Sequence, residues 1–474
     1  MLRSDQTSRM RSYGQMNHRM TYLLGVLIGL IPVPVASNRP ILWLAFGLII
    51  MLMAVWWLVK GHMLAPGRGL QIAQHKMLLV GALAVPLFAV LQALPVATSL
   101  PAMFSDLPPN AADLPRMQTL SVLPNASLIG ALRAMIFLTF LGLVIEVSSR
   151  PAQATRLGWI IFGAIFCHAI WGLVALKLLG DVGLLYTKTD YLGSATGAFV
   201  NRNSFATFLG FGVILGSGLI LGRVPERQRH SRVGSRPVVQ IIEDMLLWGS
   251  VGVIGLTLVA TQSRLGVGAT LIGVSVTVAI CRIKAGASVV QAISVVAAGL
   301  AATGITSFLI LGSDLIERMF FINSDAANRM DIYAQAFDLA MRRPFTGWGY
   351  DGFQQAFDLV RQPPLLMEQE IDLAHNSYLT LWVELGFPIG SMPLILLAVA
   401  GWSMWRNLRQ PTNFALPAAG LGALTLGAVH SLGDFSLEIP ANVFVFLAIC
   451  GLGIASAAVE SHAQNAHRKK GRCS

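Results

Sequence analysis

Residues 203–222 read NSFATFLGFGVILGSGLILG, an uncharged and mostly apolar run between Arg202 and Arg223. A helix that crosses the hydrocarbon core of a bilayer needs about 20 such residues. The run is therefore predicted to be a transmembrane helix, and it decides the class of the fold.

Eleven further apolar runs follow the same pattern. Together the twelve predicted spans cover residues 21–36, 40–59, 76–94, 127–148, 156–178, 203–222, 246–262, 264–281, 287–311, 376–403, 414–433 and 440–458. The composition agrees, because only 12% of the 474 residues are charged, whereas soluble domains carry about 25%. We expect an all-α, polytopic membrane protein with about 12 transmembrane helices.

The positive charges between the spans alternate along the chain. If the first residue is cytoplasmic, the cytoplasmic segments hold 22 of the 34 Lys and Arg residues and 6 of the 23 acidic residues. This bias obeys the positive-inside rule. The net charge of +11 then reflects topology and anionic lipid, and the dispersed basic residues indicate no nucleic-acid partner.

The map divides the chain into five parts. These are a cytoplasmic tail (1–20), transmembrane helices 1–9 (21–311), a periplasmic loop (312–375), transmembrane helices 10–12 (376–458) and a second cytoplasmic tail (459–474).

The long periplasmic loop is expected to contain short amphipathic helices. An apolar stripe at spacings of three and four predicts the first helix, formed by Met330, Tyr333, Phe337 and Met341. Pro344 ends this helix, and a second one is expected over 353–361. Two interpretations stay open: a lid or binding element, and a helix on the bilayer surface.

Three arginines, Arg133, Arg202 and Arg264, are predicted to lie at one depth near the periplasmic face. Arginine binds phosphate oxygens through a planar fork, so two or three converging side chains would hold a diphosphate. Asn201 and Asn203 would add neutral hydrogen-bond donors. The helix that starts after them would add the positive end of its dipole. A single arginine that snorkels to lipid headgroups is the alternative.

His375 is expected on the same side of the membrane and at the same depth as the three arginines. The unperturbed pKa of histidine lies near neutrality, so the side chain can accept a proton at neutral pH. Glu384 is a carboxylate inside the tenth span that would pair with one of the arginines. His430 and Asp434 form a second possible pair, for which a structural role is favoured.

The sequence predicts no metal site and no cofactor. It contains no H-E-x-x-H, C-x-x-C, P-loop, G-x-S-x-G or Asp-x-Asp pattern. The acidic segment Glu368, Glu370 and Asp372 is expected to be a solvated loop, with a loosely held cation left open.

Several motifs together resemble the O-antigen ligase / O-antigen polymerase superfamily of bacterial inner membranes. They are the run 201–206 (NRNSFA), the turn 263–266 (SRLG), the segment 344–349 (PFTGWG), the run 374–379 (AHNSYL), which includes Asn376 and Tyr378, and Leu385-Gly386 after Glu384. The resemblance covers roughly residues 120–455.

This resemblance implies a metal-independent membrane glycosyltransferase. An undecaprenyl-diphosphate-linked glycan would be transferred at the periplasmic face to a hydroxyl of a glycan, of lipid A core or of another acceptor. Arg202 and Arg264 would bind the diphosphate, Arg133 would match a further basic position, and His375 would act as general base. Ligase, polymerase and protein-glycosylating activities stay open, and a secondary transporter or flippase is the alternative class.

Overall fold

The computed structural model describes residues 2–96, 118–230, 238–312, 322–365, 371–409 and 414–455. Within these ranges the chain forms α-helices and short 3-10 turns and contains no strand, so the all-α expectation is confirmed.

The transmembrane bundle is built from helices that follow the predicted apolar runs. They are α1 (Leu2–Leu30), α2 (Pro40–Leu64), α3 (Lys76–Ala93), α4 (Pro124–Val147), α5 (Pro151–Lys177), α6 (Arg202–His230), α7 (Val238–Ala260), α8 (Arg264–Lys284), α9 (Val289–Gly312), α13 (Ser377–Gly390), α14 (Met392–Asn407), α15 (Ala415–His430) and α16 (Pro440–Ala455). Outside the bundle lie α11 (Ile322–Arg342), α12 (Phe353–Asp358) and the short turn η6 (Ser436–Glu438).

The number of helices long enough to span a membrane is below the predicted twelve. Among the described residues seven helices are long and apolar enough, or eight if α13 and α14 together form one span. The difference has a physical cause. Helices α15 and α16 have only 16 residues each, and the first two thirds of α1 carry Arg9, Arg11 and Arg19.

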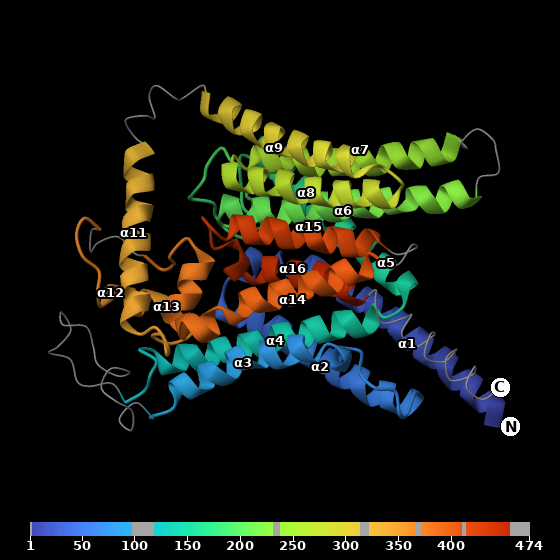
Figure 1. Cartoon of the computed structure of the whole chain (residues 1–474), viewed down its shortest axis with the longest axis horizontal. Helices are drawn as coiled ribbons and strands as arrows, with labels where there is room; N and C mark the ends of the chain where they lie inside the picture. Colours follow the sequence, from blue (N-terminus) through green and yellow to red (C-terminus); the bar gives the residue numbers. More distant parts are fainter. Residues whose placement is uncertain are drawn as a thin grey trace.

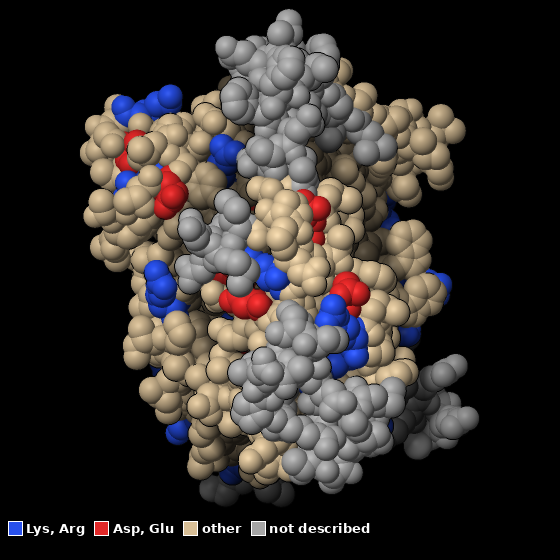
Figure 2. All heavy atoms as spheres, turned by 90° about the vertical axis from the view of Figure 1, so that its left-hand side faces the viewer, with Lys and Arg blue, Asp and Glu red and all other residues tan. Residues whose placement is uncertain are grey.

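Helices α11, α12 and α13 lie at one end of the bundle, opposite the start of α1 (Figure 1). Helix α11 runs across this end, roughly perpendicular to the bundle helices (Figure 1). Figure 2 looks onto the same end and shows basic and acidic side chains intermixed on it. Helices α11 and α12 and the start of α1 therefore lie at opposite ends of the bundle.

The tenth predicted span, 376–403, is broken. Helices α13 and α14 meet at an angle of 68°. Gly386 has φ of +70°, and a Cβ there would lie 2.7 Å from the carbonyl carbon of Phe345. The amide of Phe387 donates to the carbonyl oxygen of Pro344 (2.7 Å). The turn after α11 thus docks directly onto the altered backbone of α13.

Helix α11 is confirmed, and most of its predicted apolar stripe is exposed. Met330, Phe337 and Met341 are 48–64% exposed. The buried face instead carries Ile332, Ala336, Leu339 and Ala340. Small side chains let α11 approach α13 and α12 closely, so the bulkier residues are left on the neighbouring face.

Candidate functional site

Two of the predicted arginines are the first residues of neighbouring helices. Arg202 begins α6 and Arg264 begins α8. The two helices touch near these ends, because a Cβ at Gly266 would lie 2.5 Å from the Cβ of Ala206. A helix N-terminus carries a partial positive charge and free amide donors. Both arginine side chains therefore extend from helix N-termini, where the backbone already favours an anion.

Polar caps determine where these helices start. The Asn201 side-chain oxygen accepts from the amides of Asn203 (2.7 Å) and Ser204 (3.4 Å). The Ser263 hydroxyl accepts from the amide of Gly266 (3.2 Å). Such side-chain caps stabilise a helix by about 1 kcal/mol, and they fix which residue, here an arginine, comes first.

The two arginine side chains keep unused hydrogen-bonding capacity. Arg202 stacks over the ring of Tyr191, 5.3 Å from its centroid. Its Nε is buried and has no hydrogen-bond partner within the described part of the chain. Arg264 is half-buried. An anionic ligand would supply the acceptors that Arg202 lacks.

His375 lies immediately before α13 in a left-handed conformation, with φ of +53°. Its carbonyl oxygen accepts from the Tyr333 hydroxyl of α11 (3.1 Å), and its ring packs 5.0 Å from that of Phe435. The buried Nδ1 has no partner among the described residues. A strained, non-glycine backbone that surrounding contacts hold in place is typical of functional sites.

Electrostatics favour the neutral form of this histidine. Burial lowers the pKa of His375, and the nearby Arg329 lowers it further, while Asp434 and Asp372 oppose the shift. The imidazole is therefore unprotonated at neutral pH and able to accept a proton.

Asn376 and Tyr378 hold the start of α13 in place. The Asn376 side-chain oxygen accepts from the amides of Tyr378 (3.1 Å) and Leu379 (3.2 Å). Its amide nitrogen donates to the carbonyl of Leu432 (3.2 Å), and the Tyr378 hydroxyl donates to that of Ala428 (2.7 Å). Both predicted supporting residues thus anchor α13 to the end of α15.

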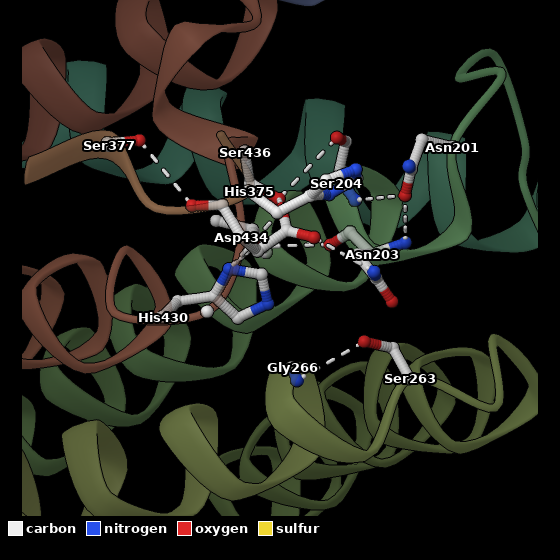
Figure 3. A network of polar contacts seen from close by, with 12 residues as sticks. Asn201, Asn203, Ser204, Ser263, Gly266, His375, Ser377, His430, Asp434 and Ser436 are labelled. Carbon is white, nitrogen blue, oxygen red and sulfur yellow. Dashed lines mark hydrogen bonds and ion pairs between the residues drawn. The ribbon is translucent and has the colours of Figure 1, made fainter. Parts of the chain in front are cut away.

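Asp434 is the centre of the polar network around His375 (Figure 3). This fully buried carboxylate accepts from Asn203 Nδ2 (2.9 Å) and from the Ser436 hydroxyl. His430 Nδ1 lies 3.8 Å from it. The predicted His430–Asp434 pair therefore exists and connects α15 to α6 beside His375.

Asn201 and Asn203 differ from the expectation in one respect. Their side-chain amides already donate within the protein, Asn201 to the Tyr191 hydroxyl (3.3 Å) and Asn203 to Asp434. These groups position the start of α6, and the arginines remain as the available donors.

Arg133 lies apart from the other two arginines. It forms an ion pair with Asp351 (2.5 Å) and lies over the ring of Trp43. Its helix, α4, contacts α16, and α16 in turn contacts α6. Arg133 lines a cavity whose lining includes neither Arg202 nor Arg264, so the expected convergence of three arginines is not observed.

That space is a cavity of about 620 Å³, lined by Arg133, Asp351 and Glu384 together with other residues of α4, α13, α14 and α16. Glu384 is buried, and its carboxylate accepts from the amide of Phe353 (3.2 Å). Arg133 forms its ion pair with Asp351 rather than with Glu384.

Arg329 of α11 was not singled out from the sequence. Its guanidinium donates to the carbonyl of Gly433 (3.3 Å), and its charge acts on His375. The sequence marks Arg329 only as one of five arginines in 312–375. The position of Arg329 near His375 depends on how α11 packs, and no local sequence pattern predicts that packing.

Most of the acidic segment for which a bound cation was left open lies outside the described residues. Glu368 and Glu370 are not among them, and Asp372 lies exposed beside the cavity. The described part of the chain contains no group of three or more His, Cys, Asp and Glu side chains arranged for a metal ion.

Comparison with known proteins identifies the central part of the chain. Residues 249–394 match the family model described as O-antigen ligase. No curated protein matches the chain. The matched segment includes Arg264, His375 and Glu384, whereas Arg202 and Asp434 lie on either side of it. The chain therefore contains a segment that matches the O-antigen ligase family, within a helical protein that has helices long and apolar enough to span a membrane.

Proposed function

We propose that this protein transfers a glycan from an undecaprenyl-diphosphate donor to an acceptor hydroxyl at the periplasmic face of the bacterial inner membrane. Arg202 and Arg264 bind the diphosphate, and His375 acts as general base. The observation that carries the proposal is that Arg202 and Arg264 are the first residues of α6 and α8, that His375 directly precedes the cap of α13, and that these three helices start at one end of the bundle (Figure 1).

The reaction needs one proton acceptor and one stabilised leaving group. His375 takes the proton from the acceptor hydroxyl as its oxygen attacks the anomeric carbon of the donor. A new glycosidic C–O bond forms, and the bond from the same carbon to the diphosphate oxygen breaks. The electron pair leaves with the diphosphate, whose added charge the arginines and helix N-termini stabilise. A single displacement of this kind inverts the anomeric configuration.

The transporter alternative receives less support. Transporters are typically built from repeats with discontinuous helices in both halves, which meet near the middle of the membrane. Among the described helices one pair, α13 and α14, shows such a break. Its bend is explained by the docked turn at Pro344.

The test replaces each arginine with lysine, which keeps the positive charge but lacks the planar guanidinium group. Arg202→Lys and Arg264→Lys should lose most glycan transfer by purified protein in liposomes, because lysine lacks the bidentate fork. Arg342→Lys is the matched control, since Arg342 lies on the surface of α11 in an ion pair with Asp338. Full activity in both site variants would remove the diphosphate role.

A further inference from the structure

A long connection without a helix, residues 178–201, joins α5 to α6 and ends directly before Arg202. Connections longer than about 12–15 residues are uncommon in a compact fold unless they serve a function or lack order. This one is held in shape by its own contacts, since the Tyr186 hydroxyl donates to the carbonyl of Phe199 (2.5 Å). We refer to residues 178–201 as the α5–α6 segment.

An ion pair between Lys188 and Asp181 holds one part of the α5–α6 segment in place. The Lys188 side chain is only 2% exposed, and its ammonium also donates to the carbonyl of Ser194 (2.6 Å). The second carboxylate oxygen of Asp181 accepts from the amide of Gly193 (2.6 Å). Hydrogen bonds to charged groups are the strong ones in proteins, so the backbone at 193–194 keeps a defined position.

Tyr191, two residues before Gly193, contacts the start of α6. Its ring centroid lies 5.3 Å from the guanidinium carbon of Arg202, and its hydroxyl accepts from Asn201 Nδ2 (3.3 Å). The Tyr191 backbone is left-handed, with φ of +55°, a conformation that persists in a non-glycine residue only where surrounding contacts impose it. An aromatic face attracts a guanidinium group through its π electrons. The stack therefore restricts Arg202 while leaving its N–H groups available for an anion.

The same part of the segment contacts the turn before Arg264. Gln262 Nε2 donates to the carbonyl of Gly193 (3.2 Å), and the amide of Ala195 donates to that of Ala260 (2.8 Å). Gln262 also has a left-handed backbone, with φ of +56°. One stretch of the α5–α6 segment, residues 191–195, therefore connects the surroundings of both arginines.

We propose that Tyr191 is a positioning residue, whose ring holds the Arg202 guanidinium in one position relative to Arg264. Two arginines grip one diphosphate only if their side chains keep a fixed separation, and such precision comes from neighbours that lock each side chain in place. The inference rests on the proposed diphosphate role of the two arginines. It adds a residue that acts on the donor through Arg202 without touching it.

The first test measures binding of undecaprenyl diphosphate to the full chain in nanodiscs. Tyr191→Leu removes the aromatic face and should weaken binding about tenfold, whereas Tyr191→Phe keeps the face and should retain most of the affinity. Tyr22→Leu is the matched control, because the Tyr22 ring stacks with Arg156 (5.9 Å) near the start of α5, and it should leave binding unchanged. Equal losses in Tyr191→Leu and Tyr191→Phe would overturn the proposal.

A double-mutant cycle shows whether Tyr191 acts through Arg202. In an Arg202→Gln background, Tyr191→Leu should cause no further loss of affinity, because the group that the ring positions is gone. Thermal unfolding checks that each variant is folded. Additive losses would mean that the ring supports binding by another route, and they would overturn the positioning role. So would undiminished binding in Tyr191→Leu if Arg202→Gln binds weakly.

A measurement without donor separates this inference from the proposed function. Phenylglyoxal modifies accessible guanidinium groups, and peptide mass spectrometry gives its rate at each arginine. Tyr191→Leu should raise the rate at Arg202 at least about twofold and leave that at Arg342, on the surface of α11, unchanged. An unchanged rate at Arg202 would overturn the positioning role. A raised rate with undiminished binding in both Tyr191→Leu and Arg202→Gln would support the positioning role and count against the proposed diphosphate site.

Discussion

At the scale of single residues, the site depends on a neutral imidazole that is held beside charged groups. The left-handed backbone of His375, the Tyr333 hydroxyl and the Phe435 ring together fix its position. We therefore expect His375→Ala and His375→Gln to lower the transfer rate by about 10²–10⁴-fold, the usual contribution of a general base. Steady-state transfer assays would show this, and turnover unchanged in both variants would remove the role.

The acid limit of activity should move with the charges around His375. Because the pKa of His375 is lowered from its ordinary value, the base is lost at a lower pH than an unperturbed histidine would be. Arg329→Gln removes a cation, so the pKa should rise and the acid limb should shift to higher pH. Asp372→Asn removes an anion, so the limb should shift to lower pH. If the acid limbs of both variants shifted in the same direction, the charges of Arg329 and Asp372 would not be what sets the pKa of His375.

Some of these residues were predictable, and others were not. His375 and the arginines at the helix starts stand out because charged and titratable side chains are rare near apolar spans. The separation of Arg133 from Arg202 depends on α16, which is distant in sequence and contacts both of their helices. The influence of Arg329 on His375 likewise needs the packed position of α11.

At the scale of elements, the turn at Gly347 positions Glu384. Gly347 has φ of +62°, and a Cβ there would lie 2.3 Å from the carbonyl oxygen of Glu384. Gly347→Ala should lower stability by more than the roughly 1–2 kcal/mol cost of the left-handed backbone alone. Gly67→Ala is the control, because Gly67 has φ of +82° and open space around it. Thermal unfolding of the two variants would separate backbone strain from the steric clash, and equal losses would count against the contact.

Helix α11 leaves the two methionines of its apolar stripe largely exposed. Met330 and Met341 are 64% and 52% exposed, and the helix lies across the bundle axis (Figure 1). We predict that the stripe touches the bilayer surface. A spin label at Met341→Cys should then be more accessible to oxygen than to an aqueous nickel chelate, whereas a label at Asp338→Cys on the exposed polar face should show the reverse. Equal aqueous access at both positions would rule out the membrane contact.

Apolar runs in the sequence predict where helices lie better than they predict bends in the helices or the faces that pack. The predicted spans 76–94 and 264–281 correspond to α3 (Lys76–Ala93) and α8 (Arg264–Lys284). The break between α13 and α14 was not predicted, because the conformation of Gly386 depends on contact with Pro344 and Phe345. The buried face of α11 was likewise not predicted, because its partners α12 and α13 select the face that packs most closely.

At the scale of the whole molecule, every step of the proposed chemistry requires that the site end of the bundle face the periplasm. The structure places α11 and α13 opposite the start of α1 (Figure 1), and the basic segments predict which end is cytoplasmic. A reporter fused after Gly286, between α8 and α9, should therefore read cytoplasmic, and one fused after Gln362 should read periplasmic. The two positions are separated by a single predicted crossing, α9, so they serve as each other's control. A cytoplasmic signal after Gln362 would place His375 and both arginines on the wrong side for a periplasmic lipid-linked donor, and the proposed function would fail with the map.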